Sequence, residues 1–68
     1  MGPVQVSYGG QLYTIVGRDI EDVENEVLGI LASGQPGWLE AVDGDPRAPH
    51  RLLITHGVPL TLAALPTG

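Results

Sequence analysis

Two histidines and two loop aspartates are the residues of this chain whose types could carry chemistry. His50 and His56 could act as bases or bind a metal ion, and Asp43 and Asp45 offer the oxygen ligands that hard cations take. A catalytic histidine needs a nucleophile beside it or a group that orients it, and the sequence names neither. Two imidazoles without cysteine also leave a zinc site incomplete. A small metal-dependent protein using His50 and His56 therefore stays an alternative function, and no catalytic, cofactor-binding or metal-ligating residue is predicted.

Both sets of residues have a simpler interpretation as turns. Glycine follows His56 and aliphatic segments flank the pair, so His56 and Gly57 fit the two-residue corner of a β-hairpin, with His56 at positive φ. Asp43 precedes glycine and Asp45 precedes proline, which are common turn sequences. A calcium loop would need further oxygens at alternate positions. We therefore expect a bend at His56 and a loop over residues 43–50.

The charge balance argues against nucleic acid and membranes as partners. The chain has a net charge of −5, three arginines and no lysine. Three cations cannot form the basic stripe that phosphate backbones require, and an anionic membrane surface is disfavoured for the same reason. We expect neither kind of partner.

Several classes of enzyme lack their signature residues in this chain. The absence of cysteine excludes a disulfide framework, a thiolate nucleophile, an iron–sulfur cluster and the usual structural zinc sites. Gly9, Gly10 and Gly17 do not have the spacing of a dinucleotide-binding loop. Ser7 and Ser33 lack the Gly-x-Ser-x-Gly setting of a hydrolase nucleophile. We expect a protein that is not an enzyme and has no cofactor.

Length and composition predict one small folded domain over residues 1–68. Hydrophobic residues make up 43% of the 68 residues, and a chain of this length buries only about 60% of the surface that its unfolded form exposes. No basic region followed by a long apolar core marks a secretory signal, so we expect a cytoplasmic location. The absence of lysine and phenylalanine beside abundant Gly, Ala, Val, Leu and Pro resembles the composition of proteins from high-G+C bacteria.

The first third of the chain has the pattern of a β-hairpin. Apolar and polar residues alternate over residues 4–8, and residues 11–16 form a second strand-like run. Between them lie Gly9 and Gly10, which can both adopt positive φ. If these two glycines are the whole loop, one face carries Val4, Val6, Tyr13 and Ile15, and the other carries Gln5, Ser7, Leu12, Thr14 and Val16. We expect the first face to lie in the core and something to cover Leu12 and Val16 on the second.

Residues 18–34 have the clearest pattern, that of an amphipathic helix. Asp19 can cap the first turn, Asp22 takes the place of the capping-box carboxylate, and Gly34 fits the position just past the end. An apolar stripe at helical spacing consists of Ile20, Val23, Val27, Ile30 and Leu31, with Leu28 on its shoulder. We expect this stripe to cover the sheet.

The second half of the chain offers strands over residues 38–42, 51–55 and 60–65. Trp38 is its most informative side chain. We expect Trp38 to pack in the core beneath the end of the helix, and the alternative is a hot spot for a partner, because tryptophan is enriched at interface centres.

The order hairpin, helix, then two to three strands predicts an α+β domain with the helix packed on one face of a mostly antiparallel sheet. Over residues 4–65 this order of elements resembles the β-grasp, or ubiquitin-like, fold. The working part of sulfur-carrier members of that group is a carboxyl-terminal Gly-Gly tail, and this chain ends in Thr67 and Gly68. The resemblance thus implies one alternative function, that of a ubiquitin-like carrier or modifier acting through Gly68.

The leading functional prediction is a non-enzymatic protein-interaction module. Small size, the missing catalytic set and apolar residues left over from the core all favour a partner protein or a second copy in a homodimer. The residues expected at the interface are Leu12, Val16 and Trp38.

Overall fold

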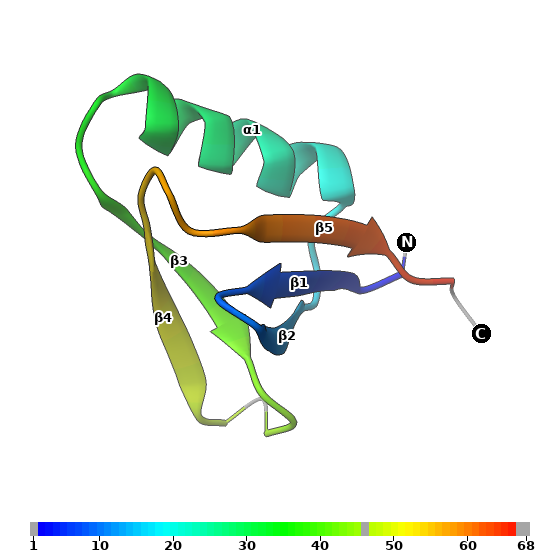
Figure 1. The fold of residues 1–68 in the computed structure, drawn as a ribbon. Helices are drawn as coiled ribbons and strands as arrows, with labels where there is room; N and C mark the ends of the chain where they lie inside the picture. The colour runs from blue at the N-terminus through cyan, green and yellow to red at the C-terminus, as the bar shows by residue number, and fades with distance from the viewer. Residues whose placement is uncertain (1, 46, 67–68) are drawn as a thin grey trace.

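The computed structural model describes residues 2–45 and 47–66, and within them the chain forms one helix and one five-stranded sheet. The elements are β1 (Val4–Tyr8), β2 (Gln11–Ile15), α1 (Ile20–Ala32), β3 (Gly37–Val42), β4 (Pro49–Ile54) and β5 (Leu60–Ala64). The strand order is β4-β3-β2-β1-β5, each neighbouring pair is antiparallel, and α1 contacts β4 and β5 (Figure 1).

This architecture confirms the expected α+β class and the order of hairpin, helix and three strands. The similarity to the β-grasp fold is confined to this order of elements. In the sheet itself β1 and β5 are antiparallel neighbours, with Val4 opposite Ala64 and Tyr8 opposite Leu60. The start of β1 and the end of β5 therefore lie side by side, and the Leu65 N–H donates to the Pro3 carbonyl over 2.9 Å.

The hairpin has the register that the sequence predicts. Val4 pairs with Ile15, Val6 with Tyr13 and Tyr8 with Gln11. The two-residue loop between the strands is glycine at both positions, with φ of 59° and 87°, a conformation that a side chain would make costly.

The helix begins and ends where its caps predict. The Asp19 carboxylate accepts the Asp22 N–H over 2.9 Å, which satisfies a donor that the first turn leaves without a helical partner. Beyond the C-terminal end of the helix, Gly34 has a φ of 74°, the left-handed conformation in which helices commonly end. The carboxylate of Asp22 does not complete a capping box but pairs with Arg18 Nε at 2.6 Å. This ion pair is the first cause of the raised pKa of Arg18, so its guanidinium stays charged.

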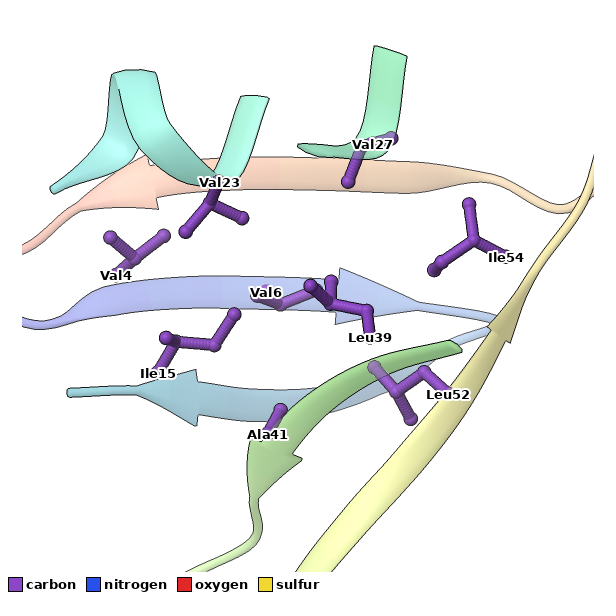
Figure 2. Close-up of a cluster of buried hydrophobic side chains, with 9 residues drawn as sticks. All are labelled: Val4, Val6, Ile15, Val23, Val27, Leu39, Ala41, Leu52 and Ile54. Atoms are coloured by element: carbon purple, nitrogen blue, oxygen red, sulfur yellow. The ribbon is translucent and has the colours of Figure 1, made fainter. Parts of the chain in front are cut away.

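The core lies between α1 and the concave face of the sheet (Figure 2). Its buried members are Val4, Val6, Ile15, Val23, Val27, Leu39, Ala41, Leu52 and Ile54. Ile20, Ile30 and Leu31 of the helical stripe are half-buried against this cluster, whereas Leu28 is 62% exposed. The stripe therefore covers the sheet as expected.

The sheet is strongly curled, and its two edges approach each other at one end. The only paired residues recorded between β2 and β3 in the described chain are Thr14 and Val42. Residues 55–59 connect β4 and β5, although these strands form opposite edges of the sheet (Figure 1). The expected hairpin around His56 is therefore wrong. The bend itself is present, but the positive φ of 91° belongs to Gly57, and His56 has a negative φ.

Candidate functional site

The two histidines lie at opposite ends of β4. His50 is the second residue of the strand, and its ring centroid is 5.8 Å from that of Tyr13. His56 lies in the turn beyond the strand, where its Nε2 is 3.2 Å from the Leu31 carbonyl oxygen. Six residues of mainly extended chain separate them by roughly 20 Å, too far for one metal ion to bind both. Within residues 2–45 and 47–66, no three His, Asp or Glu side chains gather as a metal site.

The loop aspartates form a turn. Asp45 Oδ1 accepts the backbone N–H of Arg47 over 2.9 Å and its Nε over 3.2 Å. These bonds, the backbone bond first, lower the pKa of Asp45 below its ordinary value because they favour the charged carboxylate. The loop thus has the local hydrogen bonding that the turn interpretation predicts.

Trp38 does not pack in the core, and the expectation that it would is wrong. It is the second residue of β3, its side chain is 61% exposed, and its neighbour Leu39 takes the buried position instead. Side chains alternate between the faces of a strand, so the burial of Leu39 and Ala41 directs Trp38 and Glu40 to the outer face.

The outer faces of β3 and β4 together form an apolar patch beside a pair of opposite charges. Trp38 is directly opposite Leu53, which is 42% exposed. The next pair on this face places Glu40 opposite Arg51. Paired side chains on one face of an antiparallel ladder are within contact distance of each other. We name the set Trp38, Leu53, Glu40 and Arg51 the outer patch.

A depression of about 290 Å³ extends from Glu40 and Ala41 toward the end of β2. It is lined there by Ile15, Val16 and Arg18, beside the single Thr14–Val42 pair. No pattern in the sequence indicates this depression, because it depends on where β2 and β3 part.

Leu12 and Val16 lie on the outer face of the hairpin, as expected, and are 57% and 62% exposed. Relative to Trp38 they are placed differently. The strands β2 and β3 are antiparallel and pair at Thr14 and Val42. If this register is continued, Val16 lies on the same side of the pair as Trp38, and Leu12 lies on the opposite side. Leu12 is therefore about 20 Å from Trp38 along the strand direction. The structure brings Val16 toward the outer patch and leaves Leu12 apart.

Leu53 and Arg51 are not identifiable as residues of a surface patch from the sequence alone, because residues 51–55 have only the pattern of an aliphatic strand. The available signal was alternation: once Leu52 and Ile54 face the core, Leu53 must face outward. Gly68, on which the carrier alternative depends, lies outside the described residues.

Comparison of the chain with protein-family models, with curated proteins and with solved structures finds no match. Across the part of the chain that the structure describes, no helix has the length and apolar character needed to cross a bilayer.

Proposed function

We propose that this protein is a non-enzymatic protein-interaction module that binds through the outer patch. The observation that carries the proposal is the exposure of Trp38 opposite Leu53 on a regular, paired part of the sheet. Tryptophan is among the residues that contribute most to binding when a partner buries them, and polar neighbours around it commonly form the rim. Glu40 and Arg51 supply such a rim.

The charges of the outer patch favour a second copy of the chain as its first partner. A two-fold axis through the patch would set Glu40 of one copy against Arg51 of the other, and the same apolar pair would be buried twice. A domain of 68 residues buries a smaller share of its surface than a larger domain does, so a second buried face adds proportionally more to its stability.

Sedimentation velocity from micromolar to millimolar concentration tests the proposal. We expect a monomer–dimer equilibrium, with a blue shift of the fluorescence of Trp38, the only tryptophan in the chain, as the dimer forms. Trp38→Ser and Leu53→Ser should each raise the dimer Kd by about fivefold or more, because central apolar anchors contribute more than about 1 kcal/mol each. Leu12→Ser is the matched control, because Leu12 is exposed to a similar extent but lies about 20 Å from Trp38 along the strand direction.

A wild-type monomer at millimolar concentration would reject the homodimer. A different protein would then be the partner, and it should bind Trp38→Ser more weakly than it binds Leu12→Ser. Equal binding by both variants would remove the outer patch from the proposal.

The proposal includes a cytoplasmic location in a bacterium. Its support is compositional: the chain needs no oxidising compartment, having no cysteine, and its lack of lysine and phenylalanine is typical of high-G+C genomes.

A further inference from the structure

The two edges of the sheet are protected very differently. On β4, Pro49 has no N–H to offer, Arg51 places a charge on the strand, and the carbonyl of Leu53 already accepts a hydrogen bond from the Tyr8 hydroxyl. Proline and charged side chains are the usual means by which proteins prevent strand addition at an edge. The sequence of β5, Leu-Thr-Leu-Ala-Ala, contains neither a charge nor a proline.

The hydrogen bonds at the two ends of β5 show which backbone groups face outward. Gly9 N–H donates to the Pro59 carbonyl at one end, and Leu65 N–H donates to the Pro3 carbonyl at the other. In an antiparallel ladder, residues that bond to the partner strand alternate with residues that do not. The odd-numbered residues 59–65 therefore bond toward β1, and the N–H and C=O groups of Leu60, Leu62 and Ala64 point away from it.

An apolar groove accompanies this edge. It has a volume of about 250 Å³ and is lined by Val27, Leu28 and Glu24 of the helix and by Leu60 and Leu62 of β5. Figure 1 shows α1 running alongside β5. A strand added to β5 would extend the sheet along this groove, and its alternate side chains would face Leu28 and Glu24.

The helical side of the groove is negatively charged. Glu21, Glu24 and Leu28 follow one another at helical spacing, so both carboxylates lie along the same side of α1 as the groove residue Leu28. Within residues 2–45 and 47–66 neither carboxylate has an ion pair, whereas Arg18 and Arg47 are already paired with other acidic residues. The whole chain carries a net charge of −5.

We infer that β5 accepts an extended segment of a partner protein as an added antiparallel strand, with apolar side chains in the groove and a basic side chain facing Glu24. Main-chain hydrogen bonds to Leu60, Leu62 and Ala64 would supply affinity, and alternate side chains would supply selectivity. A basic segment suits this site better than the same edge of a second copy, because that edge would bring the second copy's own Glu21 and Glu24 toward Glu24. The inference rests on the proposed role as an interaction module but uses a surface separate from the outer patch.

A pair of blocked heptapeptides tests the inference. The first is Thr-Val-Thr-Lys-Thr-Val-Thr, which presents Val, Lys and Val on one face, and the second has Glu in place of Lys. Titration of isotope-labelled protein should shift the amide resonances of Leu60, Leu62 and Ala64 and slow their hydrogen exchange. We expect the Lys peptide to bind at least about threefold more tightly than the Glu peptide, as is typical of exposed charge pairs.

Three variants separate the charge and the backbone contributions. Glu24→Lys should reverse the preference between the two peptides. Asp43→Lys, with the same change in charge on an exposed loop residue away from the groove, should keep it. Ala64→Pro removes an outward N–H while leaving the ladder to β1 intact, so it should lower the affinity for the Lys peptide about fivefold or more in a protein that stays folded.

Binding that leaves the β5 amides unshifted, or an order of affinities that Glu24→Lys does not change, would overturn the inference. Slowed exchange at Leu60, Leu62 and Ala64 on raising the protein concentration alone would also overturn it, since a second copy would then occupy the edge. Trp38→Ser should bind the Lys peptide like the wild type. Failure at this edge is therefore distinguishable from failure of the outer patch.

Discussion

The Tyr8 hydroxyl on β1 donates a hydrogen bond to the Leu53 carbonyl on β4, although β2 and β3 lie between these strands in the sheet. The contact is made across the concave side of the curled sheet, and it occupies an acceptor on the β4 edge. It joins two parts of the sheet that share little backbone pairing, because β2 and β3 have only the Thr14–Val42 pair recorded between them in the described chain.

Replacing Tyr8 with phenylalanine should therefore loosen the β4 edge. We expect Tyr8→Phe to lower the free energy of unfolding by about 0.5–1.5 kcal/mol, the usual contribution of one hydrogen bond, and to speed amide exchange in β4. Tyr13→Phe is the matched control, because no hydrogen bond from the Tyr13 hydroxyl is found among the described residues. Equal effects of the two variants in denaturant unfolding would show that the Tyr8 hydroxyl contributes nothing.

The stability lost when a leucine is truncated to alanine should increase with the burial of that leucine. Leu39 is fully buried, and Leu39→Ala should cost about 2–5 kcal/mol, a large part of the stability of a small domain. Leu31→Ala should cost less because Leu31 is only half-buried, and Leu28→Ala should change the free energy of unfolding by no more than about 0.5 kcal/mol. Urea unfolding of the three variants checks the order. A larger cost for Leu28 than for Leu31 would mean that the helix presents a different face to the sheet.

The turn between β4 and β5 should depend on its glycine more than on its histidine. Gly57 has a φ of 91° and open space around the position of a Cβ, so Gly57→Ala should cost about 1–2 kcal/mol from backbone strain alone. His56→Asn loses only the exposed contact with the Leu31 carbonyl and should keep the fold within about 0.5 kcal/mol. Thermal unfolding compares the two. Loss of partner binding in a folded His56→Asn protein would support a chemical role for this histidine.

The two exposed aliphatic residues of the hairpin should not contribute equally to self-association. Val16 lies on the Trp38 side of the Thr14–Val42 pair and Leu12 on the other, so Val16→Glu should weaken the dimer more than Leu12→Glu. Light scattering on both single variants and on the double variant measures the effect. If the double variant dimerises like the wild type, the interface lies elsewhere and the hairpin face is solvent-exposed.

The Asp45 turn should lose its contribution to stability in acid. The Arg47 N–H and Nε lower the pKa of Asp45 in the folded protein below the value of an unfolded aspartate, so the folded state favours the charged form. This contribution is fully present above the unfolded pKa of about 3.9 and disappears as the pH falls through the lower folded value. Carboxyl-carbon NMR titration should find Asp45 below the value in a short loop peptide. Arg47→Ala should raise its pKa only in part, because the backbone donor remains.

Local patterns in the sequence predicted the hairpin and the helix well. The glycine pair at positions 9 and 10 determined the loop, and the loop determined which hairpin residues face the core. Asp19 and Gly34 marked the helix ends because capping depends on residues close together in the chain.

The arrangement of β4 and β5 and the place of Trp38 could not be read from local patterns. Aliphatic segments flanking His56 and Gly57 look the same whether they pair with each other or, as here, lie at opposite edges of a curled sheet. Trp38 is expected inside because of its size, but its face is determined by Leu39 and Ala41, whose side chains take the buried positions of β3. The outer patch and the groove each combine residues from two elements, so neither is visible before these elements are placed.

The hydrogen bond between Leu65 and Pro3 has a consequence for engineering. The start of β1 and the end of β5 are held together, so the points at which a host protein would be joined to the domain lie close to each other. It could be inserted into a surface loop of an unrelated host protein without pulling that loop apart. A short linker across the same point, with new ends opened in the exposed loop between β3 and β4, would give a circular permutant that keeps all the strand pairings.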